Sequence, residues 1–167
     1  NPDVLAGAKG NTANDYVRFG FKDTKASFEL KTNTDSNACV QTTEIPLAAD
    51  ALHYWHHYLW VLDTTQESAS RRLRLYIDGK ERSTWVASQG LCITQNQTLP
   101  FWNATGATQT LGADPLGTNN FDGLLALVQF VDGQALTPAE FGLIQEQRWA
   151  PVNYSGSFGT HGFHLDF

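Results

Sequence analysis

Apolar and polar residues alternate along several segments of the 167-residue chain, and this two-residue period constrains the fold more than any other feature. Successive side chains of a β-strand point to opposite faces of the sheet, so alternation predicts strands with one buried and one solvated face. Three segments show the pattern clearly, through Val17, Phe19 and Phe21, through Ala26, Phe28 and Leu30, and through Leu73, Leu75 and Ile77. We therefore expect an all-β, antiparallel fold.

Turn residues separate these segments at a regular spacing. Asp78-Gly79 lies between two strand-like segments and predicts a tight hairpin, because glycine supplies the positive φ that such a turn needs. Asp122-Gly123 and Asp132-Gly133 bracket a predicted strand over 124–131, and the alternating residues 163–167 predict a last strand. Residues 52–62 are apolar at both parities, which predicts a central strand covered on both faces. Many short strands divided by turns indicate a jelly-roll sandwich of two sheets.

One short α-helix is expected near residues 137–147. Thr137 can cap its start, Pro138 suits the first helical position, and Glu140 completes a capping box. Pro151 favours an end at about Gln147.

Length and charge limit the classes of protein that the chain can belong to. A chain of 167 residues suits one domain, 1–167, and the absence of Met suggests a processed form or a fragment of a longer chain. The net charge of −6 repels phosphate backbones, so nucleic acid is not an expected partner. No apolar run is long enough to span a bilayer, so no membrane is expected either. Cys39 and Cys92 are expected to be buried free thiols, with a single disulfide as the alternative.

The later part of the chain resembles the concanavalin A-like domains, which include laminin-G and pentraxin modules. Residues 55–61 and 72–80 resemble the paired central strands and hairpin of that family. Residues 121–128 resemble its next strand, and residues 136–140 its short helix. The resemblance covers roughly residues 52–167, whereas the first 50 residues do not match the opening strands of the family. It implies a concanavalin A-like sandwich.

A narrower resemblance joins residues 130–138 and 154–165 to a group of phage-encoded proteins. It implies a structural domain of a bacteriophage particle, either a tail or capsid fibre or a decoration, at the surface of the virion. The implied partners are other virion proteins, further copies of this chain and, as a related hypothesis, a host-surface carbohydrate. The alternative is a secreted, extracellular laminin-G-like adhesion or lectin module. Asn96, Asn103 and Asn153 begin N-x-S/T triplets that would then be glycosylated.

Carbohydrate binding needs an exposed aromatic ring beside polar groups that read the hydroxyls. Trp102 and Asn103 are the candidates, with Trp85 behind them. The alternative is that these aromatic side chains fill the core or cover its ends.

Calcium is the metal that this fold class implies, although no cofactor is required. The oxygen ligands that a hard cation prefers are offered by the loop after Gly112, through Asp114, Asn119, Asn120 and Asp122. The alternative is that these residues form turns.

Catalysis is not expected. Hydrolases of this fold need two carboxylates on one face of a strand, and none of the 17 Asp and Glu residues lies two positions from another. The histidines at 53, 56 and 57 do not share one face of a strand, so we expect them to be packed or hydrogen-bonded rather than to bind zinc. The chain is therefore predicted to be a non-catalytic structural or binding domain.

Overall fold

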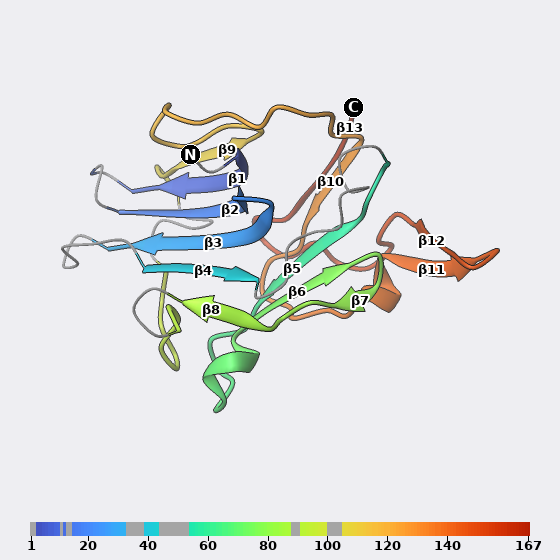
Figure 1. Cartoon of the computed structure of the whole chain (residues 1–167), viewed down its shortest axis with the longest axis horizontal. Coiled ribbons are helices and arrows are strands. Elements are labelled where there is room, and N and C mark those ends of the chain that lie inside the picture. Colours follow the sequence, from blue (N-terminus) through green and yellow to red (C-terminus); the bar gives the residue numbers. More distant parts are fainter. Residues whose placement is uncertain are drawn as a thin grey trace.

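The first layer of the structure, a computed structural model, is a six-stranded antiparallel sheet (Figure 1). The structure describes residues 3–10, 12, 15–32, 39–43, 54–87, 91–99 and 105–167. In spatial order the strands are β8 (Trp85–Ala87), β4 (Cys39–Thr43), β3 (Lys25–Lys31), β2 (Tyr16–Lys22), β1 (Asp3–Lys9) and β9 (Thr108–Leu111). The sheet therefore pairs strands from the start of the chain with strands from its middle.

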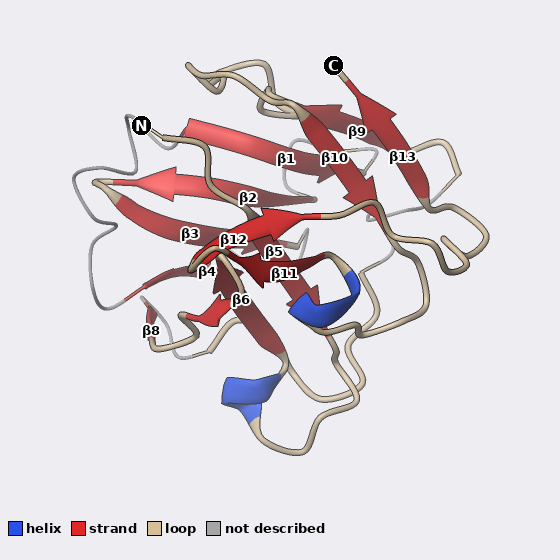
Figure 2. Ribbon diagram, turned by 90° about the vertical axis from the view of Figure 1, so that its right-hand side faces the viewer, coloured by secondary structure: helices blue, strands red, loops and turns tan. Residues whose placement is uncertain are grey.

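Shorter antiparallel sheets form the rest of the structure (Figure 2). One contains β5 (Tyr58–Leu62), β6 (Leu73–Ile77) and β7 (Lys80–Glu81). A second pairs β10 (Leu127–Phe130) with β13 (Phe163–Asp166), and a third is the hairpin of β11 (Gly142–Gln145) and β12 (Arg148–Pro151). In the described part of the chain, helical structure is limited to the 3-10 turns η2 (Ala69–Arg71) and η3 (Pro138–Glu140). No helix among the described residues is long and apolar enough to cross a membrane.

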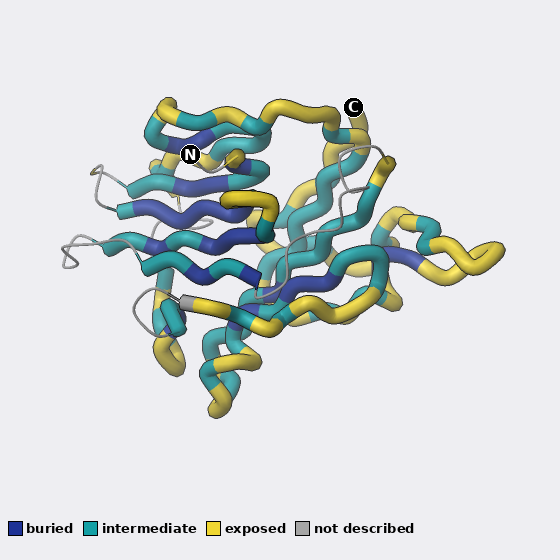
Figure 3. Tube along the Cα trace, viewed as in Figure 1, coloured by how far each residue is buried: buried dark blue, intermediate teal, exposed yellow. Residues whose placement is uncertain are grey.

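The core lies where the six-stranded sheet packs on β5 and β6. The ring of Phe19 on β2 lies 5.3 Å from that of Trp60 on β5 and 5.2 Å from that of Phe28 on β3, measured between centroids. Phe28 and Leu73 are fully buried, each contributing about 1.5–3 kcal/mol to stability. In Figure 3 the buried segments gather on the strands of the first sheet. The predicted alternation therefore produces the expected antiparallel sandwich.

A disulfide between Cys39 and Cys92 attaches β4 to the segment that follows β8. The two Cα atoms lie 5.5 Å apart, and the backbone N–H of Cys92 also donates to the side-chain oxygen of Gln41 at 2.6 Å. The prediction of two free thiols is therefore wrong, and the alternative of a single bridge is correct. The spacing of 53 residues gave no sign of the pairing, because long-range strand contacts bring the cysteines together.

The predicted α-helix over 137–147 is absent. Its start is right, because Glu140 accepts hydrogen bonds from the backbone N–H of Thr137 at 2.9 Å and from the Thr137 hydroxyl at 2.6 Å. Only the 3-10 turn η3 follows, and the chain then forms the β11–β12 hairpin. Two observations explain the change: Glu146 and Gln147 have positive φ, and a Cβ at Gly142 would lie 2.3 Å from the Trp149 ring. Cross-strand packing on Trp149 thus overrides the local preference for a helix.

Three further sequence predictions need adjustment. The first 50 residues, which matched no opening strands, supply β1 to β4. The central strand predicted over 52–62 begins only at Tyr58, and Leu52 and His53 lie outside the described residues. The strand predicted over 124–131 is shortened to Leu127–Phe130, whereas the Asp78-Gly79 turn and the last strand form as expected.

Candidate functional site

An open cleft of about 2190 Å³ lies between the six-stranded sheet and the shorter sheets. One wall comes from β1 and β2, and the other from residues 54–65, residues 121–136 and Trp149. The cleft is the candidate site, because a concave, largely apolar surface with some polar groups is the usual form of a ligand site.

Two aromatic side chains of the cleft are largely exposed to solvent. Tyr54 is 72% exposed and Trp55 is 66% exposed, and both lie just before β5. Large aromatic residues normally bury most of their surface, so two adjacent exposed rings in a cleft mark a surface that can stack on a ligand.

A row of aromatic contacts continues from this point across the cleft. The ring of His56 lies 6.4 Å from that of Tyr58, Tyr58 lies 5.2 Å from Phe21, and Phe21 lies 6.5 Å from Phe121, all between centroids. This set, His56, Tyr58, Phe21 and Phe121, is called the aromatic row below. It joins residues from three distant parts of the sequence into one surface of the cleft.

Asp78 fixes the position of the two histidines in the cleft. The Nδ1–H of His56 donates to Asp78 Oδ2 at 2.6 Å, and the backbone N–H of His57 donates to Asp78 Oδ1 at 2.9 Å. The backbone N–H of Asp78 donates in turn to the carbonyl of His57 at 2.9 Å. Asp78 can reach both because it begins the β6–β7 turn, where its φ is +50°. Within the described structure, the buried Nε2 of His56 has no hydrogen-bond partner.

His57 packs beneath this surface against Trp149. The two rings are stacked, with centroids 5.7 Å apart and planes 23° from parallel. Burial lowers the pKa of His57, although the charge of Asp78 opposes the shift, so the ring is neutral at pH 7. Burial and the Asp78 charge also raise the pKa of Tyr58 to about 12, so its hydroxyl stays protonated and can donate.

Of the three sugar-binding residues predicted from the sequence, the structure describes only Trp85, which does not line the cleft. Trp102 and Asn103 lie outside the described residues. The indole of Trp85 is stacked on Trp60 at 5.9 Å between centroids, and its Nε1–H donates to the carbonyl of Leu73 at 3.0 Å. Trp85 therefore contributes to the packing of the sandwich. Sugar binding through Trp102 and Asn103 stays a prediction.

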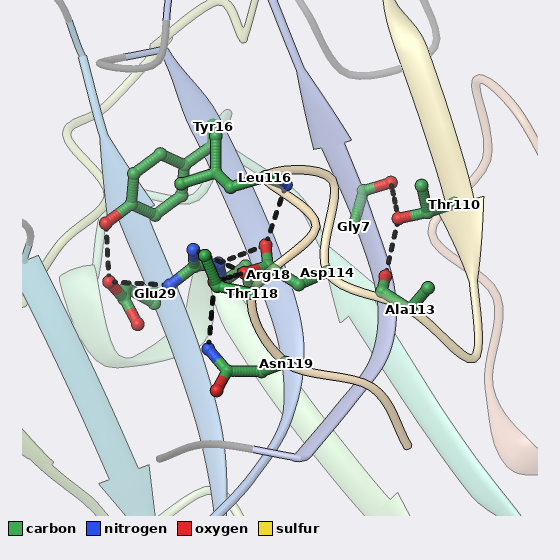
Figure 4. Close-up of polar contacts among 10 residues, drawn as sticks. All are labelled: Gly7, Tyr16, Arg18, Glu29, Thr110, Ala113, Asp114, Leu116, Thr118 and Asn119. Atoms are coloured by element: carbon green, nitrogen blue, oxygen red, sulfur yellow. Dashed lines mark hydrogen bonds and ion pairs between the residues drawn. The ribbon is translucent and has the colours of Figure 1, made fainter.

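In the predicted calcium loop, Asp114 binds a cationic group of the protein itself, the guanidinium of Arg18 on β2 (Figure 4). Asp114 is 2% exposed and accepts from Arg18 Nε and Nη2, both at 2.9 Å, and from the backbone N–H of Leu116 at 3.0 Å. It also accepts from the Thr118 hydroxyl. Burial alone raises the pKa of Asp114, but the hydrogen bonds from Thr118 and Leu116 and the charge of Arg18 outweigh it and lower the pKa.

The other predicted calcium ligands make different contacts, although the carbonyl of Asn119 accepts from the backbone N–H of Asp114 at 2.7 Å. Asn119 donates from its Nδ2 to the Thr118 hydroxyl at 3.2 Å, Asn120 forms a backbone bridge with Ala113, and Asp122 lines the cleft. Among the described residues, no three His, Cys, Asp or Glu side chains are placed to hold a metal ion. The loop geometry does not favour a second cation beside Arg18, and calcium stays an untested prediction.

The cleft was only partly visible in the sequence. The sequence pattern places Tyr54 and Trp55 in a strand covered on both faces, and no local signal shows that this strand begins only at Tyr58. The Asp78-Gly79 turn was recognised, but its role in holding His56 depends on the pairing of β5 with β6.

These features define a class of protein, an antiparallel β-sandwich with a cleft suited to binding. The chain belongs to a laminin-G family of the concanavalin A-like lectin/glucanases superfamily, because the model of that family matches residues 2–141. The match includes the first 50 residues, so the departure from the family that the sequence suggested there is corrected. A comparison with curated proteins and one with solved structures gave no match.

Proposed function

We propose that this chain is a non-catalytic domain that binds carbohydrate in the cleft and is carried on a bacteriophage particle as part of a fibre or decoration. Membership of the concanavalin A-like superfamily supports a carbohydrate-binding or structural module. The binding part of the proposal is carried by one observation: Tyr54 and Trp55 are exposed at a cleft that also contains the aromatic row.

The chemistry of the cleft suits a sugar ring. The exposed rings offer flat apolar surfaces for the C–H faces of a pyranose, and the apolar rings of Phe21 and Phe121 extend that surface. The polar groups of the cleft, including Asp78 and the protonated hydroxyl of Tyr58, supply acceptors and donors for the sugar hydroxyls.

The proposal that the domain is not an enzyme is supported by its carboxylates. Retaining glycosidases hold their acid and nucleophile about 5 Å apart, which on one strand means residues two positions apart. No Asp or Glu of the sequence has that relation to another. A sensitive assay of glucan hydrolysis is expected to show no turnover.

A binding assay with one variant tests the sugar site. Trp55→Ala removes an exposed ring, so it should leave stability within about 0.5 kcal/mol while weakening binding on a glycan array by about tenfold or more. Phe167→Ala is the matched control, because Phe167 is also aromatic, is 71% exposed and is not among the described residues that line the cleft. Equal binding by the parent and Trp55→Ala proteins would refute the proposed site.

The placement on a phage particle is supported by the sequence resemblance of residues 130–138 and 154–165. The same proposal includes contact between copies of this chain, for which the exposed apolar residues of β11 are available. Leu143 and Ile144 are successive residues of β11, so they point to opposite faces of the β11–β12 hairpin, and both are exposed. Light scattering of the isolated chain should show an oligomer. Mass spectrometry of purified bacteriophage particles should detect peptides of this chain.

A secreted laminin-G-like module is the second candidate. The Cys39–Cys92 disulfide is compatible with it and with a virion surface alike, because disulfides persist in both environments. The flanking sequence separates the two candidates: a secretory signal peptide before the domain supports the secreted module. Glycan attached to Asn96, Asn103 or Asn153 would likewise overturn the phage proposal.

A further inference from the structure

Among the described residues, the Asp, Glu, Lys and Arg side chains that line the cleft all belong to one residue type. The described lining residues include six aspartates and no Lys, Arg or Glu: Asp3, Asp23, Asp63, Asp78, Asp122 and Asp132. The chain as a whole contains 11 Lys and Arg residues, so their absence from the described lining is a property of the cleft and not of the composition.

Several of the arginine side chains already have partners outside the cleft. Arg18 pairs with Asp114 and lies 3.4 Å from Glu29, and Arg71 pairs with Glu81 at 2.8 Å. Arg72 donates to the carbonyls of Gln66, Glu67 and Ile93 at 2.8–3.0 Å. These guanidinium groups have partners in the fold that they would have to leave in order to neutralise the cleft.

Three of the aspartates lie beside the aromatic row. Asp78 is hydrogen-bonded to His56, Asp122 follows Phe121, and Asp23 lies two positions after Phe21 in the β2–β3 turn. All three of these aspartates line the same cleft as the aromatic row. Asp63 differs, because its carboxylate already accepts from the Thr65 hydroxyl at 2.7 Å and from Gln66.

We propose that the cleft accepts glycans without acidic groups and rejects glycans that carry carboxylate, sulfate or phosphate. This inference rests on the proposed carbohydrate-binding function. Ionised carboxylates only accept hydrogen bonds, so they pair with sugar hydroxyls but not with an anionic group, which offers further acceptors. Like charges brought together in a partly desolvated site are repelled strongly enough to exclude a ligand. The net charge of −6 adds repulsion of the same sign.

Calorimetry with matched oligosaccharides tests the inference. A neutral gluco-oligosaccharide and a uronic-acid oligosaccharide of equal length are titrated into the whole chain at low salt. The neutral sugar should bind at least about tenfold more tightly, a difference of 1.4 kcal/mol. The difference should shrink in 1 M salt, where the Debye length falls to about 3 Å.

A variant identifies the charges responsible. The double substitution Asp23→Asn and Asp122→Asn removes two cleft charges without changing side-chain shape, and both positions are exposed. It should reduce the discrimination against the acidic sugar, the ratio of the two dissociation constants, by about fivefold. Asp166→Asn is the control, because this exposed carboxylate does not line the cleft.

The outcomes separate the two proposals. If the acidic sugar binds as tightly as the neutral one, the charge selection is wrong and carbohydrate binding stands. If neither the paired sugars nor a broad glycan array gives binding, both proposals are wrong. If discrimination persists unchanged in the double variant and in 1 M salt, the aspartates are not its cause and the inference fails.

Discussion

Asp114→Asn is expected to destabilise the fold by about 3 kcal/mol, because it removes one charge of a buried ion pair. The side chain of Asp114 is inaccessible to solvent, and its two oxygens accept from Arg18 Nε and Nη2 at 2.9 Å. The substituted amide keeps one acceptor but turns an NH₂ group toward the guanidinium. Arg18 is then left buried with an uncharged partner at position 114, and Glu29 is its remaining carboxylate partner.

The magnitude follows from what remains after the substitution. Removing one partner of a buried pair typically costs about 3–5 kcal/mol. The lower end applies here, because Glu29 still lies 3.4 Å from Arg18 and the Asn oxygen can still accept from Leu116. For a chain of this size, such a loss lowers the melting temperature by about 6–12 °C.

The dependence on pH gives a second measurement of the same interaction. The folded-state pKa of Asp114 is lowered from its ordinary value of 3.8. Its stabilising contribution is therefore fully present above that value and is lost as the pH falls through the lower folded-state pKa. The stability difference between the parent and Asp114→Asn proteins should be constant near neutral pH and should narrow below about pH 4.

Chemical denaturation of four proteins tests the reasoning: the parent, Asp114→Asn, Arg18→Met and the double variant. The two substitutions should be non-additive by at least about 1 kcal/mol, because the partners contact each other directly. Asp166→Asn should change stability by less than about 0.5 kcal/mol. A loss below about 1 kcal/mol for Asp114→Asn, with additive effects in the double variant, would refute the proposed role of the pair.

Two further predictions concern the chain connections. Replacing Cys39 and Cys92 by Ser should cost about 2–4 kcal/mol, since the bridge closes a loop of 53 residues, and thermal melts of the variant, compared with the parent with and without reductant, measure it. Gly79→Ala should destabilise more than Gly133→Ala by at least about 1 kcal/mol in urea. Both glycines have φ near +75°, but only the Cβ at position 79 would meet the Trp149 ring, at 2.4 Å; equal losses would show that this contact is unimportant.

The sandwich was predictable from the sequence because its signals are local. The alternation through Phe19 and Phe28 places these residues in the core, and the Asp78-Gly79 dipeptide dictates the turn that forms. Such signals depend on side-chain direction and backbone freedom within a few residues.

The features that were missed depend on contacts between distant residues. The segment after Glu140 has an acceptable helix pattern, and only Trp149 packing on Gly79 and Gly142 selects a hairpin instead. Likewise, Asp114 resembled a cation ligand, and its partner Arg18 lies 96 positions away on β2. Neither contact leaves a trace in the local sequence.

The loop after Gly112 has a consequence for how sequences of this type can diverge. It lies against the six-stranded sheet so closely that a Cβ at Gly7 would fall 2.5 Å from the Pro115 ring. A side chain at position 7 would lift the loop and move Asp114 away from Arg18. The buried charge of Arg18 would then lose this partner. We therefore expect substitutions at four positions to occur together and a substitution at one of them alone to be rare: Gly7, Arg18, Asp114 and Pro115.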